Sequence, residues 1–319
     1  MEHGIGQDRA ILVVRDTVVA ARVQRHGRLT AGLVADARLI ARATSARRGT
    51  LLFDNGEEAL VDGLAADACE GATLRAVVTR AAIAETGRYK RAQARPTSIP
   101  LRAAPDLTRA LTASGLHVRK VRRFPDDPWP DIIEEALSGM VAFTGGGLIV
   151  SPTPAMTLID IDGGFAPVQL ALAAIPAIAA TLGRLDLAGS IGIDFPTIES
   201  RADRRQVDDA LSTALSGWPH ERTAINGFGF VQIVARLERP SILSIVRSDP
   251  AQAGAMLLLR RLEDVNTPGG LLATAPPSVL ASIPPSWRNE IIRRTGREIT
   301  WQADPTLAPL GGFAQAVAV

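Results

Sequence analysis

Three aspartates stand at the ends of two apolar runs in the middle of the chain. Asp160 and Asp162 close the run Met-Thr-Leu-Ile-Asp-Ile-Asp just before a double glycine, and Asp194 closes the run Ser-Ile-Gly-Ile-Asp. Side chains alternate across a strand, so Asp160 and Asp162 point to the same side. If the two strands are neighbours, Asp160 and Asp194 converge. A carboxylate in such a run is unfavourable unless it is paired or hydrogen-bonded.

Two chemical interpretations of these aspartates follow. Two or three carboxylates beside open water form a Mg²⁺ site that also takes phosphate oxygens from a substrate. Aspartates at strand ends also bond turn amides or cap helices, and the spacing alone leaves both interpretations open. Other signatures are missing, since the sequence has no Walker loop, no His-Glu-x-x-His and no Gly-x-Ser-x-Gly.

Composition narrows the class of protein. The 319 residues are 46% hydrophobic and 21% charged, which excludes disordered and coiled-coil classes. The formal net charge is +2, and all but Lys90 and Lys120 of the 35 basic residues are arginines, whose planar fork suits phosphate. A GC-rich genome would enrich arginine too. The single cysteine, Cys69, excludes an internal disulfide and a cysteine-rich zinc site, and with no signal peptide at the start it predicts a cytoplasmic protein.

The pattern of the chain predicts an α/β protein, α+β overall. Short strands with an Asn55-Gly56 hairpin, expected to be a type I′ turn, indicate a small N-terminal barrel or a remnant of one in residues 1–97. A central mixed-sheet α/β domain is predicted over 98–245, with residues 141–150 as one strand run, and a small αβ unit over 246–319. The uncharged stretches are broken by glycine and proline, so no membrane span is expected.

A family resemblance sharpens the interpretation of the central domain. It rests on Leu158-Ile-Asp-Ile-Asp-Gly163, on Asp186-Leu-Ala-Gly-Ser-Ile-Gly-Ile-Asp-Phe195, and on Phe228-Gly-Phe-Val-Gln-Ile233 followed by Arg239-Pro-Ser-Ile242. These blocks resemble the catalytic region of the ribonuclease E/G family of bacterial endoribonucleases. The resemblance implies a catalytic core of deoxyribonuclease-I-like and ribonuclease-H-like type. It also implies that Asp160 and Asp194 coordinate Mg²⁺, with Mn²⁺ as an alternative, and that Asp162, an asparagine in the family, helps to hold the site.

The departures from the family pattern are equally specific. The chain has no segment for the family's 5′-phosphate-sensing domain. The cysteine zinc link expected after Ile242 is absent, so neither zinc nor a zinc-linked tetramer is expected, and a homodimer is left open. The position just before the Phe-Gly block holds an arginine in the family but Gly227 in this chain. The run of basic residues that precedes Arg239 in the family is reduced here to Arg236 alone.

Six further residues are candidates for binding RNA. Arg201, Arg204 and Arg205 follow the Asp194 strand, and they either clamp a phosphate near the metal or form a solvated helix face. Arg236 and Arg239 remain from the thinned basic run. Phe53, near the hairpin, offers either a ring for base stacking or a core side chain.

The sequence therefore predicts a metal-dependent endoribonuclease that cleaves single-stranded RNA in RNA processing or decay, leaving a 5′-phosphate and a 3′-hydroxyl as the resemblance implies. One alternative is a catalytically weak or inactive RNA-binding protein on the same scaffold, because the family's arginines are depleted. A third is a metal-dependent phosphoesterase with a small substrate.

Overall fold

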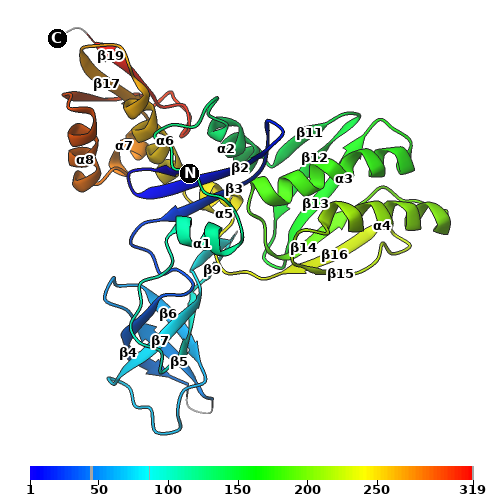
Figure 1. The fold of residues 1–319 in the computed structure, drawn as a ribbon, viewed down its shortest axis with the longest axis horizontal. Helices are drawn as coiled ribbons and strands as arrows, with labels where there is room; N and C mark the ends of the chain where they lie inside the picture. The colour runs from blue at the N-terminus through cyan, green and yellow to red at the C-terminus, as the bar shows by residue number, and fades with distance from the viewer. Residues whose placement is uncertain (44–45, 86, 318–319) are drawn as a thin grey trace.

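The computed structural model describes residues 1–43, 46–85 and 87–317 of the chain. Figure 1 shows a barrel, a central α/β unit and a C-terminal αβ unit arranged around the first strands of the chain. These strands, β1 (Glu2–His3), β2 (Gln7–Val14) and β3 (Thr17–Arg25), form an antiparallel sheet. Strand β3 packs on a helix of the central unit. The predicted region 1–97 therefore contributes to two parts of the structure.

The barrel is closed and complete. Its five strands are β4 (Val34–Arg42), β5 (Arg48–Leu52), β6 (Glu58–Asp62), β7 (Thr73–Arg80) and β10 (Ala92–Pro96). All neighbouring strands pair antiparallel except β6 and β10, which pair parallel, and this is the strand arrangement of an OB fold. Of the two predicted alternatives, the structure has the full barrel and not a remnant. A short hairpin, β8 (Ile83–Glu85) with β9 (Arg88–Lys90), precedes the last barrel strand.

The predicted barrel hairpin forms, but its turn type differs from the prediction. Strands β5 and β6 pair in antiparallel register on either side of residues 53–57. A type I′ turn needs a positive φ at both central positions. Gly56 has a φ of +80°, whereas Asn55 is not among the residues with positive φ. The longer loop allows Phe53 and Glu57 to pair through their backbones, so only the glycine takes the left-handed conformation.

The central unit is a six-stranded mixed sheet with order β11–β12–β13–β14–β16–β15. Its strands are β11 (Met140–Phe143), β12 (Gly146–Pro152), β13 (Thr157–Gly163), β14 (Gly189–Asp194), β15 (Glu221–Arg222) and β16 (Phe230–Ala235). Only β13 and β14 pair parallel. The run 141–150, predicted as one strand, is two strands joined by a turn, because Gly145 has a φ of +95° and reverses the chain.

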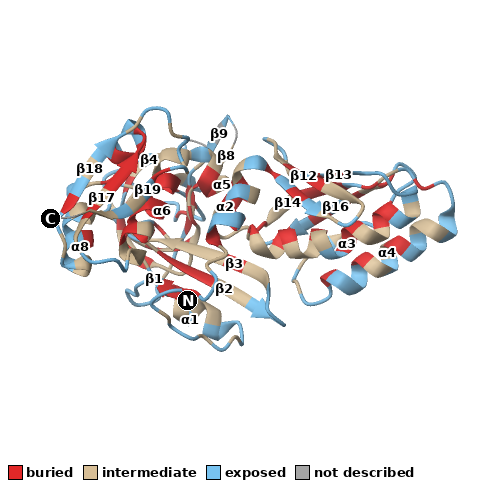
Figure 2. Ribbon diagram, turned by 90° about the horizontal axis from the view of Figure 1, so that it is seen from above, coloured by how far each residue is buried: buried red, intermediate tan, exposed pale blue. Residues whose placement is uncertain are grey.

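Helices cover one face of this sheet. Helix α3 (Pro167–Arg184) and helix α4 (Arg201–Leu215) lie along that face (Figure 2). Their buried side chains, such as Ile178 and Leu211, join one core with Ile159 and Ile193 of the sheet. Among the described residues, α3 is the one helix long and apolar enough to cross a membrane by length and composition. Of this helix, 39% is buried, including Leu170 and Ile178 in this core.

Two helices connect the barrel to the central sheet. Helix α1 (Leu107–Ala113) begins at Asp106, which caps it by accepting from the Arg109 amide, and helix α2 (Trp129–Ser138) ends at Gly139 in the left-handed conformation.

The C-terminal unit holds two helices after the central sheet and then a small sheet. Its elements are α5 (Ile242–Ser248), α6 (Pro250–Asp264), β17 (Gly270–Ala275), α7 (Pro277–Ala281), α8 (Pro285–Thr295), β18 (Ile299–Ala303) and β19 (Phe313–Val317). Strand β19, which was not predicted from the sequence, pairs antiparallel with β17 at the edge of this sheet.

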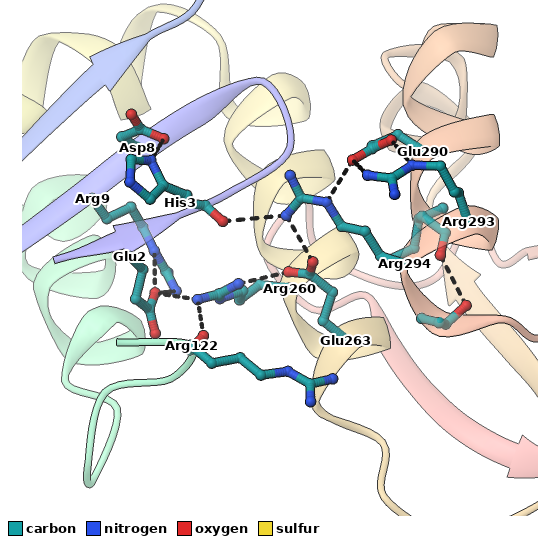
Figure 3. A network of polar contacts seen from close by, with 12 residues as sticks. Glu2, His3, Asp8, Arg9, Arg122, Arg260, Glu263, Glu290, Arg293 and Arg294 are labelled. Atoms are coloured by element: carbon teal, nitrogen blue, oxygen red, sulfur yellow. Dashed lines mark hydrogen bonds and ion pairs between the residues drawn. The ribbon is translucent and has the colours of Figure 1, made fainter. Parts of the chain in front are cut away.

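A buried ion-pair network joins the start of the chain to the C-terminal unit. Glu2, whose side chain is 1% exposed, accepts from Arg9 at 2.6 Å and lies 2.7 Å from Arg260 of α6. Figure 3 shows the contacts continuing from Arg260 through Glu263 to Arg294 of α8. Breaking such a network leaves buried charges unpaired, so these contacts fix the two segments to each other.

Candidate active site

Asp160 and Asp194 occupy directly paired positions on neighbouring strands. Strands β13 and β14 run parallel, and their register matches Ile159 with Ile193 and Asp160 with Asp194. Paired residues on adjacent strands project to the same face, at the strand separation of about 4.8 Å. The condition set by the sequence, that the two runs be neighbours, is therefore met in the structure.

The alternation of the two strands explains why the carboxylates face solvent. Ile159, Ile161 and Ile193 are buried under the helices, whereas Asp160 and Asp194 are exposed on the opposite face. Burying the isoleucines removes apolar surface from water. Because the strand period is two, that burial directs each neighbouring aspartate outward.

Asp162 lies on the same face, one step further along β13. It is exposed and pairs with Gly147 of β12, beyond the last paired residue of β14. Two residues along a strand span about 6.6 Å. Within the described ranges, no group of three or more histidine, cysteine or acidic side chains is close enough to hold one metal ion. The structure therefore brings together a pair of carboxylates, with Asp162 beside it.

The carboxylate pair has no partner of opposite charge in the described part of the chain. No hydrogen bond or ion pair joins the side chain of Asp160, Asp162 or Asp194 to any described residue. The alternative from the sequence, that local amides bind these aspartates, is therefore not what the structure shows. Two like charges placed directly opposite each other repel. An exposed pair of oxygen donors that leaves room for water is the donor set that Mg²⁺ uses in proteins, so these residues fit the ion that the family resemblance implies.

Apolar side chains border the carboxylates on the open face. Phe230 of β16 pairs with Asp194, and Ile149 of β12 pairs with Asp160. Any side chain at Gly192 would collide with the Phe230 ring, because its Cβ would lie 2.5 Å from that ring. The glycine thus allows the ring to lie across β14 beside the acidic pair.

Phe228 is a further candidate, which was not predicted from the sequence. Its side chain is 85% exposed, in the loop that precedes β16 and lies two residues from Phe230. Asn226 holds this loop, because its side-chain oxygen accepts from the amides of Phe228 at 2.9 Å and Phe230 at 3.0 Å. The sequence did contain a signal for this exposed ring, because Phe228 stands between two glycines, which have no side chains to cover it.

The three arginines of α4 have different surroundings. Arg204 donates to the carbonyls of Ile198 and Glu199 at 2.6 and 2.7 Å, so it fixes the loop that follows Asp194. Arg201 is exposed at the first position of the helix. Arg205 is 85% exposed and has only a 4.0 Å contact with Asp209. Arg201 and Arg205 therefore remain available to a phosphate, and Arg204 has a structural role.

Arg236 and Arg239 also differ. Arg236 is exposed and pairs with Glu238 at 3.0 Å. Arg239 donates two hydrogen bonds to Asp186, at 2.6 and 2.7 Å, and this carboxylate raises the pKa of Arg239 even though burial acts to lower it. Asp186 itself has a φ of +48°, so the ion pair holds a turn in an unfavourable conformation. The interpretation of Arg239 as an RNA-binding residue is corrected: its guanidinium joins two segments of the protein.

Phe53 is likewise corrected as a candidate for base stacking. Its side chain is 4% exposed and belongs to the barrel core with Leu39, Leu51 and Val61. The hairpin places the ring inside the barrel because its neighbours on the same face are core residues. Of the two roles weighed from the sequence, the structure shows the core role.

The fold and the site together define an α/β protein with an OB-type barrel and an acidic pair on an open sheet face. Residues 127–236 match the family model described as Ribonuclease E/G family, so this segment of the chain is similar to that family. The matched segment includes the acidic pair, Asp162 and the α4 arginines. A comparison with curated proteins found no match.

Proposed function

We propose that this protein is a Mg²⁺-dependent endoribonuclease that cleaves single-stranded RNA. The similarity of residues 127–236 to the ribonuclease E/G family supports a ribonuclease. The observation that carries the proposal is the register pairing of Asp160 with Asp194 on the open face of the sheet.

Asp160 and Asp194 would hold the ion, and Asp162 would orient water beside it. When bound, Mg²⁺ lowers the pKa of coordinated water and polarises a phosphate oxygen. The two paired carboxylates provide negative charge at a fixed separation, and the rigid strands keep that separation constant. Asp162 can accept a hydrogen bond from a water on the same face. The products expected from the family resemblance carry a 5′-phosphate and a 3′-hydroxyl.

The surroundings of the pair favour a single strand as the substrate. Unstacked bases can splay out and contact aromatic side chains, and Phe228 presents an exposed ring in the loop that leads into β16, whose Phe230 pairs with Asp194. Arg201 and Arg205 supply cations at the start of α4, the helix that follows the Asp194 strand. The OB-type barrel is a second surface on which the strand can bind.

The test is cleavage of an A/U-rich oligonucleotide with Mg²⁺ or Mn²⁺. We expect wild-type protein to cleave, Asp160→Asn and Asp194→Asn to lose activity, and Asp67→Asn to cleave normally. Asp67 is the matched control because it is an exposed aspartate on a barrel loop, remote in the chain from β13 and β14. Equal cleavage by Asp160→Asn and wild type would exclude the mechanism.

One observation supports the alternative of an RNA-binding protein without turnover. Arg204 and Arg239 are engaged within the protein, so fewer cations remain to bind the scissile phosphate than the sequence suggested. Under this alternative, a filter-binding assay detects salt-dependent RNA binding while no divalent ion supports cleavage. A cytoplasmic location, no zinc and no membrane association remain part of the proposal.

A further inference from the structure

A single row of paired residues crosses the central sheet through the acidic pair. The strand registers match Met140 with Ile149, Ile149 with Asp160, Asp160 with Asp194, and Asp194 with Phe230. Residues that pair directly on adjacent strands project to the same face of a sheet. The row therefore has two apolar side chains on one side of the carboxylates and one aromatic ring on the other.

The apolar members of this row face solvent, as the aspartates do. Met140 is 67% exposed and Ile149 is 40% exposed, whereas their chain neighbours Val141 and Leu148 are buried in the core under the helices. Helices α3 and α4 lie on the other face of the sheet (Figure 2). The same alternation that turns the aspartates outward thus turns these apolar side chains outward. Contiguous exposed apolar side chains of this kind indicate a binding surface.

The ring of Phe230 is held in place on the other side of the pair. A Cβ atom added to Gly192 would lie 2.5 Å from this ring, 2.9 Å from the Leu158 side chain and 3.0 Å from the sulfur of Met156. Three apolar side chains therefore converge over this glycine, which lies two residues before Asp194 on β14. Phe230 remains partly exposed, so its ring is available to a ligand on the open face.

The row is symmetrical about the acidic pair. Neighbouring strands lie about 4.8 Å apart, so Ile149 and Phe230 are each roughly 7 Å from the midpoint between Asp160 and Asp194. Met140, one strand further out, is roughly 12 Å from that midpoint. A phosphate bound at the pair would thus have an apolar side chain at a similar distance on either side of it.

The acidic pair determines what kind of molecule can cover this row. A protein surface there would bury Asp160 and Asp194, with which no described cationic side chain is paired, and burying unpaired charges is strongly unfavourable. A polynucleotide can bring a phosphate to a cation at the pair and place the faces of its bases on apolar side chains. In a duplex these faces are stacked on one another, so only a single strand can turn them to the sheet.

We propose that the two bases that flank the scissile phosphate lie on this row, one on Ile149 and the other on Phe230, with Met140 in contact with the next base beyond Ile149. The RNA strand then runs across β13 and β14, not along them. This inference rests on the proposed function, because it needs the scissile phosphate at the acidic pair. Apolar contacts to base faces are tolerant of sequence, so the row selects single strands without reading which bases they carry.

The experiment uses three versions of one A/U-rich oligonucleotide whose cleavage position has been mapped with the wild-type protein and Mg²⁺. One version is intact, one lacks the base just 5′ of the scissile phosphate, and one lacks the base just 3′ of it. On the intact version, Ile149→Ser should lower kcat/KM at least about fivefold, because an apolar contact is lost. On one of the two abasic versions it should have no further effect, since the base that it would contact is already missing.

Phe230→Leu tests the other side of the row. This change removes the ring but keeps an apolar side chain over Gly192, and it should lose its effect only on the abasic version to which Ile149→Ser still responds. Val234→Ser is the matched control, because Val234 is 51% exposed on the same face of β16 but roughly 13 Å along the strand from Phe230. It should cleave all three versions as the wild type does. Comparing substrates on one variant also removes any effect of a smaller folded fraction.

The outcomes separate this inference from the proposed function. If the wild type cleaves no RNA with any divalent ion, the proposed function fails and the row loses its role with it. If the wild type cleaves but Ile149→Ser and Phe230→Leu respond to the same abasic version, or to neither, only the path along the row is overturned. If Ile149→Ser instead turns a wild-type dimer into a monomer in sedimentation, the row is an interface between copies and the proposal is also overturned.

Discussion

Asp160 and Asp194 face each other across one pair of parallel strands, with no cationic side chain of the described residues between them. Such an arrangement does not help folding, because like charges directly opposite each other on a sheet are destabilising. The isoleucines around them keep the strands in register despite this repulsion. Stability therefore does not explain the pair, whereas the cation that we propose would.

The first prediction is that removing one of these carboxylates has opposite effects on cleavage and on stability. Asp160→Asn should reduce Mg²⁺-dependent cleavage at least about 100-fold, because one ligand to the ion is lost. In the absence of divalent ions, the same change should raise the free energy of unfolding by about 0.2–1 kcal/mol, since the repulsion is relieved. Oligonucleotide cleavage and thermal melting in EDTA measure the two effects.

Added Mg²⁺ provides the internal control for this prediction. An ion that binds only the folded state raises the melting temperature of the wild type. Asp160→Asn and Asp194→Asn should show little of this increase, and Asp67→Asn should show all of it. A decrease in stability of Asp160→Asn in EDTA would mean that the carboxylate has a structural partner, contrary to the geometry.

The second prediction compares two phenylalanines. Phe228→Ala should weaken binding of a single-stranded oligonucleotide by about 1–3 kcal/mol, because an exposed ring that stacks on a base is removed. It should leave the melting temperature unchanged, since Phe228 is exposed. Phe53→Ala should instead destabilise the barrel by about 3–5 kcal/mol, as expected for a core phenylalanine.

Fluorescence anisotropy with a labelled oligonucleotide and thermal melting separate the two roles. Binding should be measured in EDTA so that cleavage does not interfere. A Phe228→Ala protein that binds RNA as the wild type does would remove this ring from the proposed substrate path.

The sequence predicted the acidic pair because local patterns determined it. Alternating isoleucine and aspartate fixes which side of β13 each residue faces, and the short connection through one helix favours parallel neighbours. The barrel hairpin was also predicted from a local signal, the Asn55-Gly56 pair. The division of residues 141–150 into two strands was not predicted, because this run has no charged residue and its turn is marked only by Thr144 and the glycines that follow it.

The roles of the arginines depended on contacts between distant segments. Arg239 lies 53 residues from Asp186, and nothing in the local pattern of either residue indicates their ion pair. Asp186 and Arg239 both lie in sequence blocks that carry the family resemblance. A structural role for the two residues is one explanation of why they occur in those blocks.

The third prediction separates a surface arginine from a structural one. Arg205→Ala should weaken RNA binding and reduce the slope of log affinity against log salt by about 0.7, the value for one phosphate contact on a single strand. Stability should not change, because the exposed contact with Asp209 contributes little.

Arg239→Ala is the comparison for this prediction. It leaves Asp186 without its bidentate partner and should lower stability by about 1–3 kcal/mol. Its salt slope should stay at the wild-type value when binding is measured well below the melting temperature. A reduced slope for Arg239→Ala would restore its assignment as a phosphate contact.

The fourth prediction concerns acid stability and the ion pair that holds the loop before β16. Arg222 donates to Asp208 of α4 at 2.6 Å, and the Ile225 amide donates to the same carboxylate at 3.1 Å. Burial alone would raise the pKa of Asp208, but these hydrogen bonds outweigh it and lower the pKa below the usual 3.8. A carboxyl group with a lowered pKa stabilises the folded state above its unfolded pKa and loses that contribution as pH falls through the folded value.

Asp208→Asn should therefore lower the melting temperature most clearly between about pH 5 and 7, where the wild-type carboxylate is ionised. The difference from wild type should shrink as pH falls below about 4, because protonation removes the same interaction. Asp67→Asn, on an exposed loop, provides a matched baseline at each pH. A difference that stays constant from pH 7 down to pH 3 would show that the ionised form of Asp208 is not what binds Arg222 and the Ile225 amide.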